Sequence, residues 1–295
     1  MIKRLNYHQI DFEKYQNCIE TSVQRNFYAK KEILDTLCEE WELLVSGDYD
    51  YVMPVPLKKK YGFHFVLMPL FCQQLGVFSK TVNCEMEQQF LTFLEENYRV
   101  FSYYFNHQNT FNEDLKVKKN YFIERMEYSV LRKNYFKGRK STVKTAQYLD
   151  FKEVGLAETF GFITDNFKGL EKRSDLQKFL SYLKFLETKK MLRIFGAFKE
   201  NQLASLAIMI CEGESFALLG LVNDEKCRLD NGASYLIDRI LKENIHEKSF
   251  DFMGGSIRGI EVFFKSFGAD LVTYPVIQNS KKELIYKFLS KIIPN

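Results

Sequence analysis

Apolar residues recur with two different periods between residues 214 and 277, and this stretch organises the prediction for the whole chain. The segments SFALLGLV, FDFM and DLVTYPVI have the composition of strands. Between them, SYLIDRILKENI and GGSIRGIEVFFKSFGA repeat their apolar positions at helical spacing. One apolar face of the second helix is expected to hold Ile257, Ile260, Phe263, Phe264 and Phe267. This order predicts an α/β unit in which helices pack on a sheet.

The same two periods divide the rest of the chain. Helical patterns cover residues 1–45, which include Trp41, and also residues 84–98 and 150–190. Strand-like patterns cover residues 49–70, 100–105, 121–131 and 191–211. A chain of 295 residues with this order predicts two domains, residues 1–140 and 141–280. A C-terminal helix over residues 281–295 is expected to pack back on the body.

Composition narrows the class of protein further. With 46% hydrophobic residues the chain can bury a large core, and a net charge of +4 is too small to indicate a nucleic-acid binder by itself. Its 6 cysteines and 4 histidines are scattered without metal-ligand spacing. The N-terminus lacks a signal-peptide core, and Glu212-Gly213-Glu214 divides the longest apolar run. We therefore expect a cytoplasmic protein with reduced cysteines, no bound metal and no membrane span.

One segment departs from the balanced charge of the rest. Residues 129–149 contain no acidic residue, and their cations are Arg132, Lys133, Lys137, Arg139, Lys140 and Lys144. A solvated helix face and a contact with a polyanion both explain this pattern. The polyanion would be a nucleotide diphosphate or the acceptor end of an RNA.

A phosphate-binding loop is predicted after the strand that ends near Val222. Asn231-Gly232-Ala233 leads into a helix, where free backbone N–H groups and the helix dipole favour an anion. The run Arg228-Leu229-Asp230-Asn231-Gly232-Ala233 resembles the Gln/Arg-x-x-Gly-x-Gly/Ala loop of the GNAT acyltransferases, with Asn231 in place of the first glycine. In GNAT proteins this loop holds the cofactor's pyrophosphate, and two neighbouring strands part to admit its pantetheine. The resemblance implies a cofactor site at Arg228, Asn231, Gly232, Ala233 and Ser234.

Four segments give a more specific resemblance. The segments are DFMGGSIRGIEVFFKSFGA, YAKKEILDTL, MPVPLKKKYG and CQQLGVFS. Taken together, they resemble the Fem-type peptidyltransferases and the wider group of FemAB-like proteins, over most of the chain. The resemblance implies an α/β (α+β) fold of tandem GNAT-like domains, with mixed, mostly antiparallel sheets flanked by helices. Characterised Fem-type enzymes pass an amino acid from aminoacyl-tRNA to a peptidoglycan precursor. Other members with this architecture are thought to use acyl-CoA.

The same resemblance implies the donor, the partners and one catalytic motif. The donor would be an acyl-CoA such as acetyl-CoA, or an aminoacyl-tRNA bound along Arg132 to Lys144, and the acceptor a small-molecule or peptide amine. In Fem-type enzymes a Phe-Lys pair ahead of a Phe-Gly is implicated in stabilising the transferring acyl group. The matching residues are Phe264, Lys265, Phe267 and Gly268, with one residue fewer between the Lys and the second Phe. Met253 stands where relatives often place an acid.

Acyl transfer to an amine needs a proton acceptor and positive charge near the carbonyl oxygen. Asp251, at a strand end, is the candidate acceptor, and bonding to a loop or helix start is the alternative. Lys265 and Arg258 are the candidates for positive charge. An exposed ion-pair row of Arg258, Glu261 and Lys265 explains their spacing as well.

Neutral polar residues complete the candidate site. Tyr235 and Tyr274 could protonate a leaving group or could only pack in the core. Gln73 and Gln74 lie between apolar runs, where they could bind substrate or bond neighbouring backbone in a core turn. Arg258 and Phe264 are further candidates for substrate binding.

Two hypotheses follow from these residues. The first is an N-acyltransferase or aminoacyltransferase whose amine acceptor binds between the two domains. The second is a catalytically inactive double-GNAT binding protein. The first requires that the strands ending near Val222 and Met253 part at their ends, so that an acyl carrier can pass between them.

Overall fold

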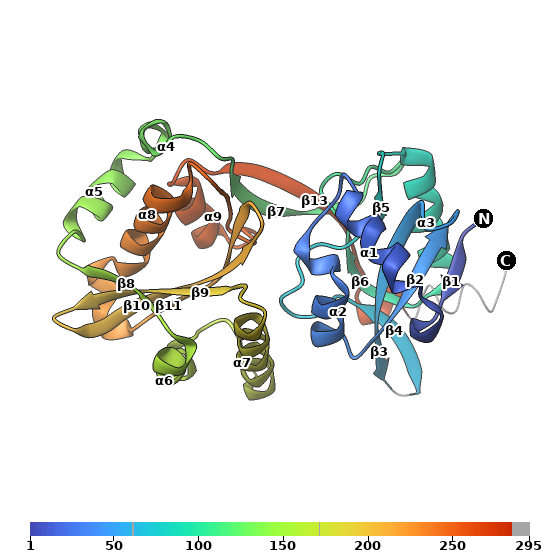
Figure 1. Cartoon of the computed structure of the whole chain (residues 1–295), viewed down its shortest axis with the longest axis horizontal. Helices are drawn as coiled ribbons and strands as arrows, with labels where there is room; N and C mark the ends of the chain where they lie inside the picture. The colour runs from blue at the N-terminus through green and yellow to red at the C-terminus, as the bar shows by residue number, and fades with distance from the viewer. Residues whose placement is uncertain (61, 171, 285–295) are drawn as a thin grey trace. The chain divides into compact units, whose positions relative to one another are not determined.

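The computed structural model describes residues 1–60, 62–170 and 172–284, and it divides into two units (Figure 1). The first unit is Met1–Lys118 with Thr273–Asn295, and the second is Lys119–Val272. The predicted boundary at residue 140 falls inside the second unit, within helix α5 (Lys137–Thr145). From residue 285 onward, the predicted C-terminal helix lies outside the described residues.

The first unit is a mixed sheet with helices. Its strand order is β1 (Lys3–Leu5), β2 (Glu40–Ser46), β3 (Tyr51–Lys60), β4 (Phe63–Leu67), β6 (Val100–Tyr104) and β13 (Asp270–Gln278), and β5 (Phe78–Ser79) pairs with β3. Neighbouring strands are antiparallel except β4 and β6, which are parallel. The helices are α1 (Phe12–Thr21), α2 (Lys31–Leu37) and α3 (Cys84–Asn97). Asp11 caps α1 and Asn83 caps α3, because their side chains accept bonds from free first-turn N–H groups.

In the first unit, the segment that follows β4 continues along the edge of its parallel partner β6. Beyond β4, the Met68 N–H donates to the Ser102 carbonyl at 3.1 Å, and the Leu75 N–H donates to the Tyr104 carbonyl at 2.8 Å. The Gly76 N–H also donates to the Tyr103 hydroxyl. Residues 68–77 therefore bond to the edge of β6 beyond its pairing with β4.

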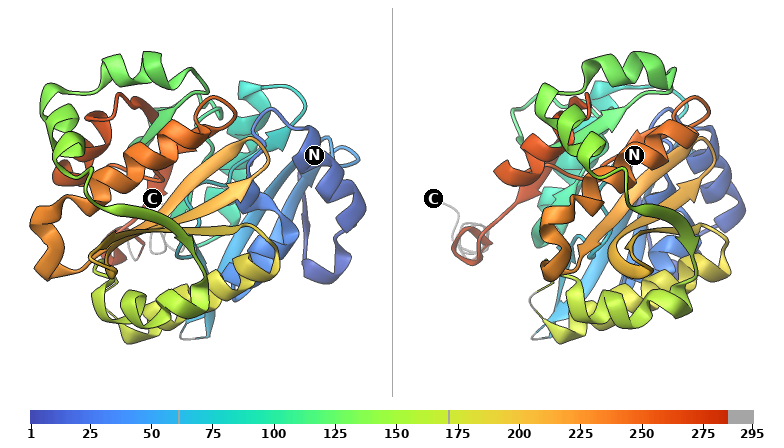
Figure 2. Two further views of the ribbon diagram at one scale, coloured as in Figure 1. Left: turned by 60° about the vertical axis from the view of Figure 1, so that its left-hand side comes forward. Right: turned by 90° about the vertical axis from the view of Figure 1, so that its left-hand side faces the viewer.

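The second unit repeats this plan with different lengths. Its strand order is β7 (Lys116–Ile123), β12 (Ser249–Asp251), β11 (Ser215–Asn223), β10 (Gln202–Glu212), β9 (Leu192–Lys199) and β8 (Asp150–Val154). The helices are α4 (Tyr128–Asn134), α5, α6 (Leu156–Asn166), α7 (Arg173–Thr188), α8 (Gly232–Asn244) and α9 (Arg258–Lys265). In Figure 1 and Figure 2, α6 and α7 cover one face of this sheet, and α4, α5, α8 and α9 cover the other. These two layers confirm the predicted fold class.

Strands β11 and β12 part after a short parallel contact. They pair only at Ser215 with Ser249, Phe216 with Phe250 and Ala217 with Asp251. From Leu218 onward, β11 keeps its pairing with β10, interrupted by a bulge at Leu219, and it no longer pairs with β12. The predicted parting of these strands is confirmed. In the first unit, residues 68–77 bond to the strand beside the parting, whereas no backbone hydrogen bond joins the described residues after β12 to β11.

The last strand of each unit comes from a distant part of the chain. In the second unit, Phe122 and Ile123 of β7 pair with β12, although β7 begins in the first half of the sequence. In the first unit, residues 276–278 of β13 pair with residues 102–104 of β6. The chain thus crosses between the units inside β7 and again inside β13.

Several sequence-based element predictions are wrong. Trp41 lies in strand β2 and not in a helix, because residues 40–46 pair with β1 and β3. Its ring packs on Tyr15 of α1, and its Nε1 donates to Asp35 of α2. Residues 150–154 form β8, although they were included in a helical stretch. The strand predicted over residues 121–131 ends at Ile123, and helix α4 follows from Tyr128.

The apolar stripe predicted for α9 is only partly buried. Phe264 and Phe267 are buried against Phe252, whereas Ile257 is 66% exposed and Ile260 is 41% exposed. The helix begins at Arg258, so Ile257 is its N-cap and lies outside the helical repeat. The expected five-residue face is therefore wrong at its N-terminal end.

Candidate functional site

Asp251 lies where β12 ends and parts from β11. Its Oδ1 accepts the side-chain amide of Asn120 at 2.9 Å and the backbone N–H of Met253 at 2.7 Å. No described residue donates to its Oδ2. Burial raises the pKa of Asp251 to about 6, and the two hydrogen bonds oppose that rise. This carboxylate is ionised at neutral pH, keeps one oxygen free and has the proton affinity of a general base.

The loop after Asp251 has an unusual backbone. Met253, Gly254 and Gly255 have φ angles of 53°, 148° and 141°, all positive. The Gly254 N–H donates to the side-chain amide oxygen Oδ1 of Asn120 at 2.8 Å. A Cβ on Gly255 would come within 2.4 Å of a ring carbon of Tyr121, so only glycine fits there. The loop is thereby held close to β7.

Glu261 of α9 collects the charged groups beside this loop. It accepts hydrogen bonds from the Tyr121 hydroxyl at 2.8 Å and from the Lys119 ammonium at 3.0 Å, and it pairs with Lys265 at 3.3 Å. These bonds, that of Tyr121 first, lower the pKa of Glu261 to about 2. Glu261 is therefore a fixed anion. Lys265, with 45% of its side chain exposed, is paired with it, as in the predicted ion-pair row.

The predicted phosphate loop is the start of α8. Asn231 has φ 60°, in the left-handed region, and its side chain donates to the Leu229 carbonyl and does not cap the helix. A Cβ on Gly232 would lie 2.3 Å from the Ser205 hydroxyl, so this glycine lets α8 approach β10. The helix start therefore sits at the open end of β11. Arg228 points outward, with a long ion pair of 3.4 Å to Glu225.

Ser234, in the first turn of α8, is already bonded. Its hydroxyl accepts a hydrogen bond from the guanidinium of Arg139, whose Nε donates to the Ser266 hydroxyl at 2.8 Å. Arg139 also lies over the rings of Phe263 and Phe267, at 4.4 and 4.7 Å from their centroids. Burial lowers the pKa of Arg139. This side chain connects α5 to both α8 and α9.

The remaining candidates of the second half are three buried aromatic residues and one exposed arginine. Tyr235 is 5% exposed in the core, where burial raises the pKa of its hydroxyl. Tyr274 is also buried and falls in the first unit. Phe264 packs against Phe252 with ring centroids 4.4 Å apart, and Arg258 is exposed at the start of α9.

The two glutamines of the first unit differ from each other. Gln74 is buried, and its amide oxygen accepts the His107 N–H at 2.9 Å. Gln73 is 9% exposed, and both polar atoms of its amide are buried without a hydrogen-bond partner among the described residues. An unsatisfied buried amide is costly, so Gln73 stays a candidate for ligand contact.

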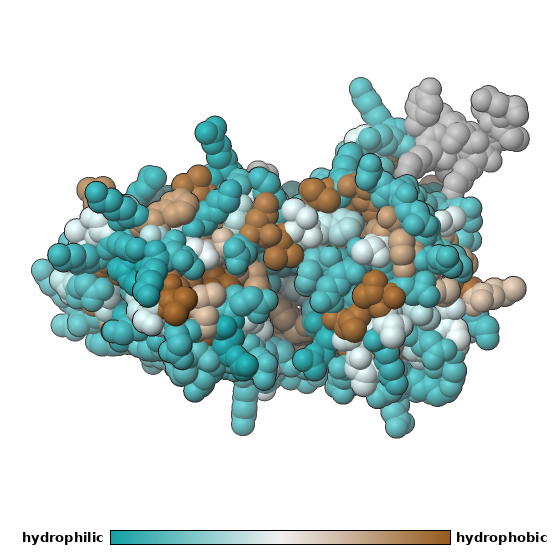
Figure 3. All heavy atoms as spheres, turned by 90° about the horizontal axis from the view of Figure 1, so that it is seen from above, coloured by the Kyte–Doolittle hydropathy of each residue, from teal (hydrophilic) through white to brown (hydrophobic). Residues whose placement is uncertain are grey.

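The basic segment of α4 and α5 presents fewer charges than its sequence indicates. Arg132 approaches Asp238 at 3.8 Å, and Arg139 is directed at the two serines, so the outward cations are lysines. Figure 3 shows the face of the molecule above these helices, where apolar side chains gather in small groups between hydrophilic ones. Val130 and Phe136 are among the exposed apolar side chains of this segment.

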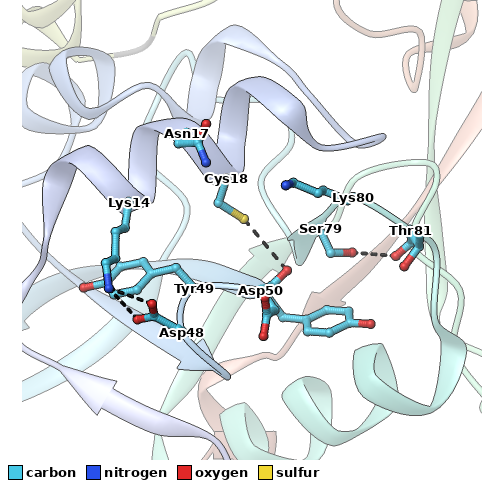
Figure 4. Close-up of a pocket in the computed structure, with 10 residues that line it drawn as sticks. Lys14, Asn17, Cys18, Asp48, Tyr49, Asp50, Ser79, Lys80 and Thr81 are labelled. Atoms are coloured by element: carbon cyan, nitrogen blue, oxygen red, sulfur yellow. Dashed lines mark hydrogen bonds and ion pairs between the residues drawn. The ribbon is translucent and has the colours of Figure 1, made fainter.

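A separate hollow of 390 Å³ lies in the first unit, under α1 (Figure 4). Lys14 points to Asp48 across it with a 2.6 Å ion pair, and the Ser79 hydroxyl donates to the Thr81 carbonyl. The Cys18 thiol faces the Asp50 carbonyl, and burial raises its pKa to about 11, so it is not a reactive thiolate. None of the predicted site residues lines this hollow.

The described residues contain neither a metal-binding cluster nor a membrane-spanning helix. Residues 1–60, 62–170 and 172–284 contain no group of three or more His, Cys, Asp or Glu side chains that could hold a metal ion. Within the same ranges, no helix is both long and apolar enough to span a bilayer.

Sequence reasoning proposed Asp251 and the start of α8 as candidates, but it did not propose Asn120 or the inward contacts of Arg139. Asn120 belongs to KVKKNYFI, a strand in which asparagine has a low propensity, and that was the available signal. Arg139 was counted only as part of a charge cluster. Its inward direction has no signature in the sequence.

Comparison with known proteins shows the fold. No family model and no curated protein matches the chain. Among solved structures, FemX aligns with a TM-score of 0.63 at 9% identity, covering 99% of this chain and 100% of that one. A tandem GNAT protein from the clavulanic acid biosynthesis pathway gives 0.53 at 9% identity, covering 94% and 97%. The C-terminal DUF2156 domain of a putative lysylphosphatidylglycerol synthetase from Agrobacterium fabrum gives 0.51 at 9%, covering 96% of each. The chain therefore has the FemAB-like fold of two GNAT domains.

Proposed function

We propose that this protein transfers an acyl or aminoacyl group to an amine, with the donor bound in the second unit. The observation that carries the proposal is the parting of β11 from β12, with Asp251 at the point where they separate. Beyond Ala217, no strand of the described residues pairs with this edge of β11, so its backbone could bond the amides of an acyl carrier. The equivalent edge in the first unit is occupied by residues 68–77.

The proposed reaction uses Asp251 as the proton acceptor. The amine lone pair attacks the acyl carbon, the N–H proton moves to Oδ2 of Asp251, and the bond to the thiol or ribose oxygen of the donor breaks. The protonated Asp251 can return the proton to that leaving group, and Tyr235 is the alternative proton donor. Arg258 and Lys265 of α9 are the proposed positive groups for the carbonyl oxygen.

The start of α8 is the proposed phosphate site of the donor. Arg228, Asn231, Gly232, Ala233 and Ser234 would hold the pyrophosphate of acyl-CoA, because the first N–H groups of α8 have no side-chain cap. An aminoacyl-tRNA is the other proposed donor, with its acceptor end along the lysines of α4 and α5. Arg258 and Phe264 are the proposed contacts of the amine acceptor in the second unit, and Gln73 and Gln74 are proposed ligand contacts within the first unit.

Two observations favour the second candidate, a double-GNAT protein that binds without catalysis. Lys265 is neutralised by Glu261, and Asn231 replaces the glycine of the phosphate loop. Either change weakens the charge available to a transition state. Such a protein would still bind a donor or an acceptor.

A donor panel separates the two candidates. The purified chain is mixed with acetyl-CoA, a long-chain acyl-CoA or an aminoacyl-tRNA, and its melting temperature is measured, followed by thiol release or loss of the aminoacyl ester with added amines. A transferase gives stabilisation by one donor and an amine-dependent rate that is lost in Asp251→Asn. Stabilisation without any rate supports the binding protein. A chain that responds to no donor contradicts both.

A further inference from the structure

The environment of Asn120 combines deep burial with complete pairing. It lies on β7 with 4% of its surface exposed. Its side chain bonds Asp251 and Gly254, which lie at the two ends of one short segment at the end of β12. Its Nδ2 donates to Oδ1 of Asp251 at 2.9 Å, and its Oδ1 accepts the Gly254 N–H at 2.8 Å. The amide has only one possible orientation, because a carboxylate accepts and a backbone N–H donates.

This arrangement fixes which oxygen of Asp251 is free. Asn120 and the Met253 N–H both bond Oδ1, so the carboxyl group cannot rotate without losing two hydrogen bonds. Oδ2 is left without a donor among the described residues. The same amide fixes Gly254, and with it the positive-φ turn that carries the chain from β12 toward α9.

We infer that Asn120 is a positioning residue, which holds Oδ1 of Asp251 so that Oδ2 faces the amine as proton acceptor. The inference rests on the proposed function for its catalytic meaning, but the contact between the two side chains can be measured by itself. Asn120 does not touch the substrate. It acts by restricting the rotation of Asp251 and by favouring its charged form through the donated N–H.

Asn120 is the side chain whose hydrogen bond lowers the pKa of Asp251, because the neighbouring charged groups are paired elsewhere. On β7 and α9, Lys119 and Lys265 both pair with Glu261. The segment SFALLGLVN of β11 contains no ionisable residue. Besides burial, the influences on its protonation are the bonds from Met253 and Asn120. A change at Asn120 should therefore be visible in the titration of Asp251.

The test compares Asn120→Leu and Asn120→Asp with the wild type. Leucine keeps most of the volume and removes both bonds, while aspartate keeps the acceptor for Gly254 and places a second carboxyl group beside Asp251. Carbon-13 NMR of the Asp251 carboxyl group should show a pKa raised by about one pH unit in Asn120→Leu and by more in Asn120→Asp. The acid limb of the kcat profile should move by the same amount, with kcat reduced about tenfold and KM little changed.

Asn106→Leu is the matched control. Asn106 is equally buried in the first unit, where it bonds the Gln24 carbonyl and the Gln108 N–H, so its loss affects stability but not the titration of Asp251. An unmoved Asp251 titration in both Asn120 variants overturns the inference whether or not the protein is active. A moved titration with an unmoved kinetic limb overturns the catalytic role. A moved titration in a wild-type chain that transfers no acyl group supports the contact and rejects the proposed function. If Asn120→Leu does not fold, the isosteric Asn120→Asp gives the same decision.

Discussion

The two oxygens of Asp251 have different surroundings, and this has a consequence for stability as well as for chemistry. Oδ1 accepts two hydrogen bonds, but burial still raises the pKa from 3.8 to about 6. The folded state therefore binds this proton more tightly than the unfolded state does. Keeping Asp251 charged at neutral pH therefore costs stability.

Replacing Asp251 by Asn should stabilise the protein at pH 7.5. Because the folded pKa lies above the unfolded one, the penalty is absent below pH 4 and complete above pH 6, where it amounts to about 2 to 3 kcal/mol. Urea unfolding of Asp251→Asn should show this gain at pH 7.5 and little gain at pH 4. The exposed Asp165 of α6 is the control, since Asp165→Asn should change little at either pH. Equal effects at both pH values would contradict the raised pKa.

Glu261 should show the opposite pH dependence. Its bonds with Tyr121, Lys119 and Lys265 lower its pKa from 4.5 to about 2, so its contribution to stability is present above pH 4.5 and is lost as the pH falls toward 2. Glu261→Gln should therefore be less stable than the wild type at pH 7, and the two should converge on acidification. Thermal midpoints between pH 3 and pH 7 measure this. A constant difference across that range would mean that the carboxylate charge is unimportant.

At the scale of elements, the turn between β12 and α9 requires glycine at two positions for different reasons, backbone conformation at one and lack of space at the other. Gly254 and Gly255 both have positive φ, but a Cβ at Gly254 meets nothing within 4 Å, whereas one at Gly255 meets the Tyr121 ring at 2.4 Å. We expect Gly254→Ala to cost about 1 kcal/mol from backbone strain alone. Gly255→Ala should cost about 3 kcal/mol, because the ring must move as well. Urea unfolding of the two variants measures the difference, and equal losses would show that the ring yields freely.

Arg139 should stabilise the packing of α5 on α8 and α9. Arg139→Met keeps the apolar stem but removes the bonds to Ser234 and Ser266 and the contact with two aromatic rings, so we expect a loss of about 1 to 3 kcal/mol in the free energy of unfolding. Lys144→Met on the exposed face of the same helix is the control, with a change below about 0.5 kcal/mol. Similar losses for both variants would mean that helix propensity, and not the contact, decides stability.

Helices with one apolar stripe were predictable from the sequence, whereas short strands beside them were not. The period of α8 is unambiguous, and the structure buries Leu236, Ile237, Ile240 and Leu241 as expected. In contrast, residues 40–46 have apolar residues that fit both periods, and only pairing with β1 and β3 makes them a strand. Local pattern cannot report a partner that lies elsewhere in the chain.

The candidate site was predictable to the same extent. Asp251 could be proposed from the sequence because it is an acid at the end of a predicted strand, beside the expected parting of two strands. Asn120 could not be paired with it, since more than half of the second unit separates the two residues in sequence. The pairing of Lys265 with Glu261 was expected from helical spacing, whereas the arrival of Lys119 and Tyr121 from β7 was not.

For the molecule as a whole, the origin of the last strand in each unit decides how the chain can be divided. Residues 119–272 include the part of β7 that pairs with β12, whereas residues 141–280 lack β7 and α4. We expect a fragment of residues 119–272 to unfold cooperatively in urea, and a fragment of residues 141–280 to leave β12 with an open edge and to aggregate. Circular dichroism and light scattering distinguish the two. Cooperative unfolding of both fragments would show that β7 is dispensable.

Because the last strand of the first unit is encoded after the second unit, the order of synthesis on the ribosome affects when the first unit can complete its sheet. The first unit emerges early, but residues 276–278, which complete its sheet beside β6, are made only after the entire second unit. Until then the nascent chain presents β6 with an unfilled side, a surface that other polypeptides can extend. Folding therefore depends on β13 pairing with β6 before another polypeptide does, so the need for chaperones during translation should be set by β13 and not by the candidate site.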